Sequence, residues 1–234
     1  MQRNLYPLKI LCLQTALFIS YESEVLKYRV FINNHKESRM KKLSLVAALM
    51  IAIPTAASAK EEHFTIDPLH TYPHFKINHL GFSTMQGHFG KTSGKIMMDR
   101  QAGTGSIDIV IDAASVYTGM KKRDDHLRSI DFLNVMEFPE ITYKAKTIEF
   151  HKGGKMATAH GDLTILGVTK HVALDVASIH CGIHPMDPKK EKYVCGFDVT
   201  AKFKRSDFDM SFSLPAIGDE MALFFGVEAI RNKD

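Results

Sequence analysis

Apolar and polar residues alternate along much of the chain beyond residue 73. In residues 106–112, SIDIVID, the three isoleucines share one face and both aspartates share the other. Because successive side chains of a β-strand point to opposite faces, this alternation predicts a half-buried strand. Comparable runs predict strands at 74–78, 106–112, 140–146, 162–165, 171–176, 197–203 and 221–227. Turn residues separate these runs and long helical periodicity is nearly absent, which predicts an antiparallel barrel or sandwich.

The alternation also predicts which side chains face the interior. We expect the inward set to be Phe75, Ile77, Ile107, Ile109, Ile111, Phe197, Val199, Phe203, Leu223 and Phe225. Lys76, Asp108 and Lys202 should face solvent. An eight-stranded barrel either fills its interior with side chains or holds one ligand. The pattern alone leaves a filled core and an apolar tunnel open, and the predicted inward residues are the tunnel lining in the second case.

One segment, residues 122–135, breaks the β pattern. Leu127, Ile130 and either Leu133 or Asn134 recur at helical spacing, which predicts a short helix across the side or mouth of the barrel. The opposite face of this helix would carry the charged residues Arg123, Asp124, Asp125 and Arg128. These charges are expected to cap the helix and clamp it to the barrel rim, with a role near the polar head of a ligand as the alternative.

Residues 40–59 have the pattern of a secretory signal peptide. Basic residues lead into the uninterrupted apolar run 43–53, and positions 57–59 read Ala-Ser-Ala, with small residues at −3 and −1. The run is shorter than the roughly 20 residues that span a bilayer. We therefore expect cleavage after Ala59 and export of residues 60–234 to the periplasm, without stable membrane insertion.

The predicted leader leaves residues 1–39 without a role. Met40 is followed directly by two lysines, as a start residue of a signal peptide should be. We interpret residues 1–39 as an upstream extension that results from a mis-assigned start, with a longer genuine leader as the alternative. This segment is kept out of the fold prediction.

Removal of the leader changes the charge and leaves an even number of cysteines. Eight of the 30 basic and three of the 26 acidic residues lie in 1–59, which leaves 22 basic and 23 acidic residues in 60–234. A nearly neutral domain has no electrostatic footprint for nucleic acid. Cys181 and Cys195 remain, and an oxidising compartment favours a disulfide between them over a metal site with His180 and His184. The residues between them contain two prolines and a run of charges, which predicts an exposed loop.

Patterns of catalysis and of metal binding are weak. His70, His74, His79 and His88 cluster in sequence, but strand parity places His74 and His79 on opposite faces. The sequence has no GxSxG turn after a strand, no phosphate-binding glycine loop and no HExxH helix. We therefore expect a protein that is not an enzyme and that uses no metal or cofactor.

Several sequence blocks, in order, resemble the YceI-like family of exported lipid-binding proteins across essentially all of residues 60–234. The blocks are Phe75-x-Ile77-x-His79-Leu80-Gly81, Gly87-x-Phe89, Arg123-Asp124-x-His126-Leu127-Arg128-Ser129-x-Asp131-Phe132, Phe138-Pro139, Gly161-Asp162-Leu163-Thr164-Ile165-x-Gly167-Val168-Thr169 and Arg205-Ser206-Asp207-Phe208. The chain departs from the family at Thr71, where serine is frequent, and at Asp209, where glycine is common. Both departures concern local turns.

This resemblance implies a lipocalin-like, eight-stranded antiparallel barrel with a short helix packed on it. It also implies that a polyisoprenoid, such as a polyprenyl quinone or polyprenyl alcohol, binds in the apolar tunnel. The expected role is a periplasmic carrier of such an amphiphile. The alternatives are an enzyme acting on the lipid, with His79 and residues 123–131 as candidates, and a ligand-free structural or stress-response barrel. Homodimer formation is left open.

Overall fold

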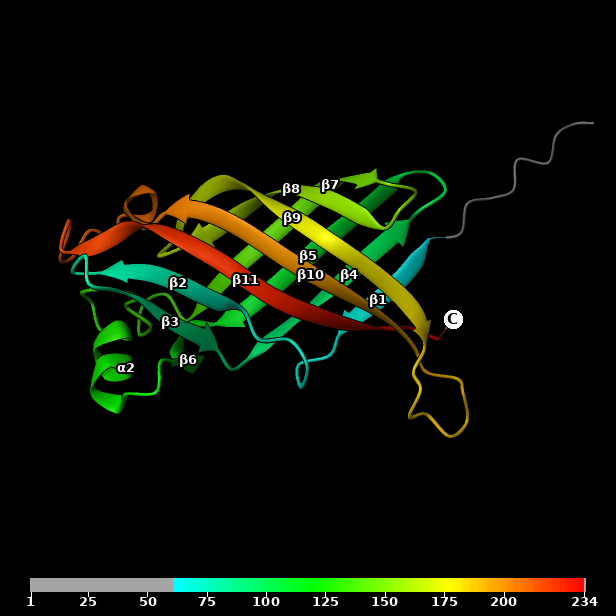
Figure 1. Ribbon diagram of the computed structural model, residues 1–234, viewed down its shortest axis with the longest axis horizontal. Helices are drawn as coiled ribbons and strands as arrows, with labels where there is room; N and C mark the ends of the chain where they lie inside the picture. Colours follow the sequence, from blue (N-terminus) through cyan, green and yellow to red (C-terminus); the bar gives the residue numbers. More distant parts are fainter. Residues whose placement is uncertain (1–60, 234) are drawn as a thin grey trace, which may run out of the picture. The chain divides into compact units, whose positions relative to one another are not determined.

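In a computed structural model, residues 61–233 are described. They contain an antiparallel barrel of eight strands closed on itself, with one α-helix beside one end (Figure 1). The predicted barrel and helix are thus confirmed. The predicted extension (1–39), the signal peptide (40–59) and Lys60 lie outside the described residues. Within residues 61–233, no helix is long and apolar enough to cross a membrane.

The barrel is built from long antiparallel strands that follow one another around the wall. In chain order the strands are β1 (Glu62–Ile66), β2 (His74–His79), β3 (Ser83–Phe89), β4 (Thr92–Asp99), β5 (Thr104–Asp112), β6 (Val116–Tyr117), β7 (Glu140–His151), β8 (Met156–Ile165), β9 (Val168–Ile183), β10 (Tyr193–Lys204) and β11 (Ile217–Arg231). Their order in the sheet is β1-β4-β5-β7-β8-β9-β10-β11-β2-β3-β6. Pairing of β1 with β11 closes the barrel.

Two ends of the barrel differ because β11 changes partners along its length. Its C-terminal part pairs with β1 through Ala229 to Arg231, and its N-terminal part pairs with β2 through Ile217 to Phe224. At the β1 end the wall is therefore complete. At the other end β2, β3 and β6 extend the wall, and helix α2 (Lys121–Leu127) lies beside β6 (Figure 1).

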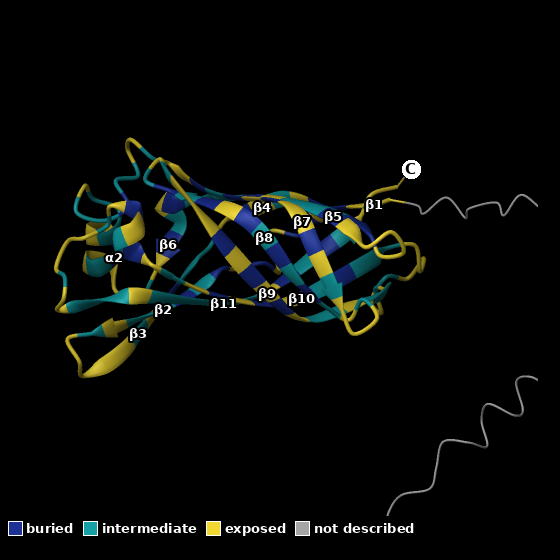
Figure 2. Cartoon of the chain, turned by 90° about the horizontal axis from the view of Figure 1, so that it is seen from above, coloured by how far each residue is buried: buried dark blue, intermediate teal, exposed yellow. Residues whose placement is uncertain are grey.

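Alternate residues are buried along much of the barrel wall, as the sequence pattern predicts. In β9 the buried positions are Val172, Leu174 and Val176, and in β7 they are Ile141, Tyr143 and Ala145, followed by Ile148 after a register shift between Ala145 and Thr147. Figure 2 shows this alternation as dark and light bands along the strands. All seven predicted strand segments lie within observed strands. Strands β1, β3, β4 and β6 were not predicted.

The predicted helix is too long, and its end corrects the sequence interpretation. Helix α2 stops at Leu127, and the chain continues through turns to Phe138. Arg128, which follows its last residue, donates hydrogen bonds from Nε and Nη2 to the carbonyl oxygens of Ala114 and Val116, both at 2.7 Å. Because the helix ends before Ile130, this residue does not share a face with Leu133: Leu133 is buried, whereas Ile130 is 82% exposed.

Asp124 was predicted on the exposed, charged face of the helix and is instead buried, with 3% of its surface exposed. Its carboxylate accepts hydrogen bonds from Thr118 N at 2.9 Å and from Thr118 Oγ1. Arg123 donates from Nε and Nη2 to the same threonine, each at 2.7 Å. These contacts hold α2 against the wall, in agreement with a clamping role for the charged residues.

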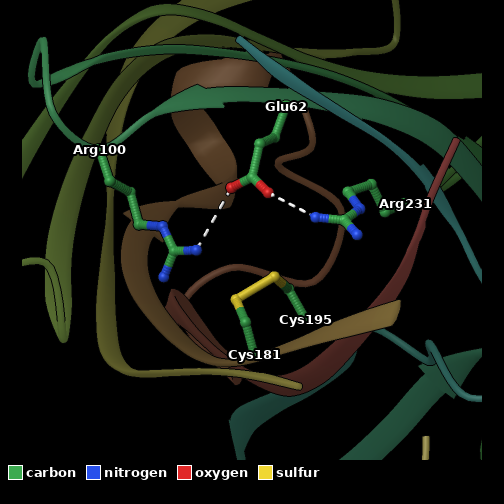
Figure 3. The surroundings of a disulfide bond; sticks show 5 residues. All are labelled: Glu62, Arg100, Cys181, Cys195 and Arg231. Atoms are coloured by element: carbon green, nitrogen blue, oxygen red, sulfur yellow. Dashed lines mark hydrogen bonds and ion pairs between the residues drawn. A yellow bond between two sulfur atoms is a disulfide. The ribbon is translucent and has the colours of Figure 1, made fainter. Parts of the chain in front are cut away.

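A disulfide and a group of ion pairs lie at the end of the barrel where β1 closes the wall (Figure 3). Cys181 of β9 and Cys195 of β10 are direct cross-strand partners with Cα atoms 4.1 Å apart, and they form the predicted disulfide. Glu62 accepts from Arg231 at 3.0 Å and from Arg100 at 3.3 Å. The predicted loop between the cysteines is shorter than expected, because both strands continue past the disulfide and leave only 184–192 outside them.

Candidate ligand-binding cavity

A cavity of about 390 Å³ occupies the barrel between its centre and the end near α2. Most of its lining is apolar, and contributions come from nearly every strand and from the loops beside α2. Ile109 and Leu174 at its deep end are buried, whereas His126 and Phe212 at the other end are exposed to solvent. The cavity therefore reaches solvent at the α2 end, which we call the mouth, and its deep end lies toward the disulfide.

Seven of the ten residues predicted to face the interior line this cavity. They are Phe75, Ile77, Ile109, Ile111, Phe203, Leu223 and Phe225. The other three, Ile107, Phe197 and Val199, line a separate cavity of about 40 Å³ closer to the disulfide. That these residues contact a ligand stays a prediction. For Ile107, Phe197 and Val199 the geometry places the side chain beyond the deep end of the main cavity.

The residues predicted to face solvent follow the same parity. Asp108 and Lys202 are exposed. Lys76 is half-buried because its Nζ lies over the ring of Phe224 on the outer face of the barrel, 4.1 Å from the ring centre. A cation above an aromatic face is a favourable arrangement on a protein surface.

Two cavity-lining aromatic rings occupy space that glycines leave free on neighbouring strands. A Cβ atom at Gly87 would lie 2.5 Å from the ring of Phe75, its cross-strand partner. A Cβ atom at Gly161 would lie 2.6 Å from the ring of Tyr143 and 2.7 Å from the carbonyl oxygen of Lys144. Glycine at both positions thus lets large rings lie flat against the wall, which keeps the lumen open.

Tyr143 is anchored to the wall by its hydroxyl group. This oxygen lies 2.9 Å from the carbonyl oxygen of Ala159 and 3.0 Å from that of Val172, so its proton is shared between two acceptors. Burial, with a smaller contribution from Asp162, raises the pKa of Tyr143 above its ordinary value. The phenol therefore remains a neutral donor, and the ring presents an apolar face to the cavity.

Arg205 lines the mouth and is the largest fully buried side chain, with 2% of its surface exposed. Its guanidinium donates hydrogen bonds to the main-chain carbonyl oxygens of Met210, Phe212, Ile217 and Gly218, at 2.8 to 3.0 Å. Burial lowers its pKa, and Asp219 opposes that effect. With these bonds the planar, forked guanidinium of Arg205 holds the loop between β10 and β11 in place.

An aromatic cluster lies where the cavity reaches solvent. Rings of His126, Phe132 and Phe212 contact one another edge to face, with centroids 5.0 to 5.4 Å apart, and all three line the cavity. His126 Nε2 also lies 2.8 Å from a carboxylate oxygen of Asp131. Arg123, Ser213, Gln86 and His79, the residue named above as a catalytic candidate, also bring polar atoms to the cavity lining.

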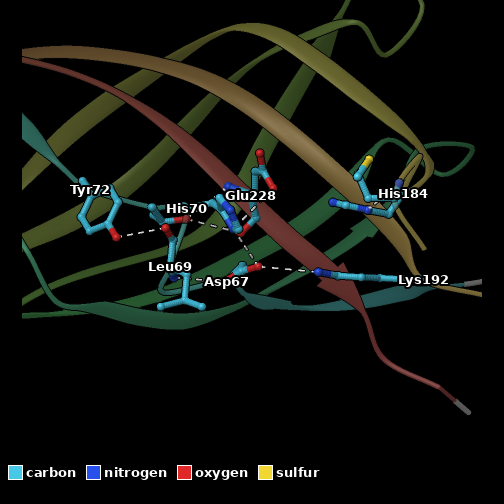
Figure 4. A network of polar contacts seen from close by, with 9 residues as sticks. Asp67, Leu69, His70, Tyr72, His184, Lys192 and Glu228 are labelled. Atoms are coloured by element: carbon cyan, nitrogen blue, oxygen red, sulfur yellow. Dashed lines mark hydrogen bonds and ion pairs between the residues drawn. The ribbon is translucent and has the colours of Figure 1, made fainter. Parts of the chain in front are cut away.

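A separate polar network on the outside of the barrel involves His70 (Figure 4). Asp67 Oδ2 lies 3.1 Å from His70 Nδ1, and Glu228 Oε2 lies 4.0 Å from the same nitrogen. These three groups could hold a metal ion. However, Lys192 Nζ already lies 3.8 Å from Asp67 Oδ2. Since a protein cation balances the buried carboxylate, the network is better explained as a clamp on the β1–β2 loop.

The sequence did not identify Tyr143, Arg205, Phe132 or Phe212 as residues of the site. Tyr143 follows the inward parity of its predicted strand, which was a signal that could have found it. Arg205 appeared only as part of a family block. Phe132 and Phe212 come from loops far apart in the sequence, and no local pattern brings them together.

Residues 64–229 match the YceI-like domain family. A UPF0312 protein of Pectobacterium carotovorum is 34% identical over 192 residues, which cover 82% of this chain and 97% of that protein. Protein YceI of Escherichia coli O157:H7 is 32% identical over 197 residues, which cover 83% of this chain and all of the relative.

Solved structures of similar fold include a YceI protein of Campylobacter jejuni, 30% identical with a TM-score of 0.56, covering 67% of this chain and 90% of that one. BcnA of Burkholderia cenocepacia is 22% identical with a TM-score of 0.60 and covers 70% of this chain and 98% of its own. A polyisoprenoid-binding domain from Saccharophagus degradans is 15% identical with a TM-score of 0.53, covering 72% and 98%. The last two likenesses concern the fold.

Proposed function

Because this chain belongs to the YceI-like family, we propose that it binds the hydrocarbon part of a polyisoprenoid or similar amphiphile inside its barrel. The observation that carries the proposal is the cavity of about 390 Å³, which is apolar in its lining and reaches solvent at the mouth. A barrel that simply filled its interior would leave no such space. The ligand named for the Saccharophagus degradans domain suits a cavity of this chemistry.

The cavity volume sets how much of the ligand is enclosed. A dry apolar cavity of about 150 Å³ holds benzene, with six carbon atoms. On that scale 390 Å³ encloses about 16 carbon atoms, or three isoprene units. A longer chain would extend from the mouth with its polar head outside the barrel. The ligand therefore enters with its hydrocarbon end first.

Polar groups at the mouth are placed to meet the part of the ligand that remains near solvent. Arg123 lines the cavity at the mouth, where its Nε and Nη2 donate hydrogen bonds to Thr118. His126 and Ser213 line the same region. Donors of this kind suit a quinone carbonyl, a hydroxyl or a phosphate group. They lie at the opposite end from the apolar deep end, which is lined by Ile109, Leu174 and Phe225.

We further propose that the protein works as a periplasmic carrier. The support is the predicted signal peptide and its Ala-Ser-Ala site before Lys60. The disulfide between Cys181 and Cys195 is typical of proteins from oxidising compartments. Intact-mass measurement of the protein from a periplasmic extract should give a chain that starts at Lys60, and retained upstream residues would contradict the cleavage site.

The ligand can be tested by mass spectrometry of organic extracts from purified protein. We expect a prenyl lipid in the wild type and its loss in Ile109→Glu, because an unpaired charge in the cavity wall costs several kcal/mol to desolvate. Asp108→Lys, one residue away on the exposed face, is the matched control and should retain the lipid. Circular dichroism separates loss of ligand from loss of fold. Wild-type extracts without any lipid would contradict the proposal.

A further inference from the structure

Large apolar side chains are exposed around the mouth of the barrel. They lie in three segments, residues 79–83, 118–138 and 205–217, which we call the rim. The exposed members are Leu80, Phe82, Met120, Ile130, Met136 and Phe212. Met136, Phe82 and Ile130 are 93%, 90% and 82% exposed, so they gain almost nothing from the fold itself. Isolated exposed apolar residues are ordinary, but a group at one end of a barrel indicates an interaction surface.

The three rim segments are joined to one another around the opening. Leu80 N donates to the carbonyl oxygen of Ala216 at 2.8 Å, which ties the β2–β3 turn to the β10–β11 loop. Phe212 of that loop contacts Phe132 and His126 of the segment that contains α2. Figure 1 shows α2, the β2–β3 turn and the β10–β11 connection at the same end of the barrel.

Charge does not explain what the rim contacts. The three segments together contain five Lys or Arg and six Asp or Glu. A nearly balanced surface is attracted neither to nucleic acid nor to a strongly charged protein. The feature that distinguishes the rim is therefore its protruding apolar tips, which surround an apolar cavity.

We infer that the rim is a docking surface for a lipid bilayer, with the mouth facing the membrane. This inference rests on the proposed function, because the hydrocarbon chain of the ligand would otherwise have to cross water between membrane and cavity. Apolar side chains at the tips of separate turns can each enter the interfacial region of a bilayer. A protein partner or second copy seated on the rim would instead cover the mouth, where the cavity reaches solvent.

The test is flotation of the purified protein with phosphatidylcholine vesicles, which carry no net charge. Wild-type protein should float with the vesicles, and binding should persist in 0.5 M NaCl because the rim is nearly neutral. Phe82→Ser combined with Ile130→Ser should weaken vesicle binding at least tenfold. Leu69→Ser combined with Met186→Ser is the matched control, since these side chains are 72% and 82% exposed but lie outside the rim. The control should bind like wild type.

A second readout separates docking from ligand binding. Neither pair of substitutions lines the cavity, so both variants, once bound lipid has been extracted, should bind N-phenyl-1-naphthylamine, a small apolar fluorophore, as delipidated wild type does. Equal vesicle binding by the rim variant and wild type overturns the docking surface while leaving the proposed function intact. A wild-type dimer that the rim substitutions dissociate, seen by sedimentation, assigns the rim to a second copy and also overturns it. Failure of delipidated, folded wild type to bind the fluorophore instead contradicts the proposed function.

Discussion

The deep wall of the cavity should set the length of chain that the barrel encloses. Ile109, Leu174 and Phe225 line both the main cavity and the small one beyond it, so these side chains separate the two. Replacement of Phe225 by alanine removes a ring of six carbon atoms, which frees that space for the ligand and joins the 40 Å³ cavity to the main one. At about 25 Å³ per carbon, the scale set by benzene in a 150 Å³ cavity, the 40 Å³ cavity adds space for one or two further carbons of the ligand. One additional isoprene unit should therefore fit.

The expected gain in affinity follows from the added contacts. Large ligands gain about 0.3 kcal/mol per heavy atom, so five carbons give about 1.5 kcal/mol, or about tenfold in dissociation constant. Geranylgeraniol has four isoprene units and farnesol has three. We expect the ratio of the farnesol to the geranylgeraniol dissociation constant to be about ten times larger for Phe225→Ala than for wild type. The unliganded variant should be less stable by about 3 kcal/mol, since a large ring is lost from the interior.

Displacement of N-phenyl-1-naphthylamine by the two alcohols measures this preference. Phe203→Ala is the matched control, because it removes the same ring from the same cavity but near the mouth, where it packs on Phe208. It should leave the ratio of the two affinities unchanged. The reasoning is refuted by an unchanged ratio in a folded Phe225→Ala protein, or by an equal change in the control.

Three further predictions concern the frame around the cavity. Arg205→Met should lower the thermal midpoint and expose the β10–β11 loop to proteolysis, because four partly buried carbonyl oxygens lose their donor at about 1 kcal/mol each; a protease-resistant loop would contradict this. Replacement of Cys181 and Cys195 by alanine should lower the free energy of unfolding in urea by up to about 3 kcal/mol, which is the chain-entropy value for a loop of about 15 residues. The variant and the reduced wild type should then have equal free energies of unfolding. Hydrogen bonds from Ser206 lower the pKa of Asp219 in the folded protein. The contribution of Asp219 to stability is therefore present above its unfolded pKa of about 3.9 and is lost as the pH falls through the lower folded value. Asp219→Asn should flatten that part of the acid-unfolding curve.

Most of the strands could be predicted because one face of each is buried and the other is wet. Strand β3 escaped prediction for a reason that the cavity explains. Its inward positions are Met85, Gly87 and Phe89, and the glycine interrupts the apolar alternation because the ring of Phe75 occupies the space of its side chain. Strand β4 has Ile96, Met97 and Met98 in a row, which hides its alternation.

The mouth could not be predicted to the same degree, because long-range contacts shape it. Periodicity placed residues 122–135 in one helix, but the helix ends at Leu127 where Arg128 binds the carbonyl oxygens of Ala114 and Val116. No local pattern reveals such an interaction. The cavity wall, in contrast, follows directly from strand parity, although parity cannot tell how far along the barrel the open space extends.

Stability and access are separated along the barrel, which is consistent with the carrier role proposed above. The closed end contains the disulfide, the Glu62 ion pairs and Arg231 stacked on Tyr193, 4.1 Å from the ring centre, all between neighbouring strands. At the mouth, by contrast, β6 is only two residues long, and loops held by Arg205 complete the wall. Regions with fewer regular hydrogen bonds open at lower free energy than closed β-sheet. Entry and release of a hydrocarbon chain can therefore occur by local opening at the mouth while the opposite end keeps the barrel closed.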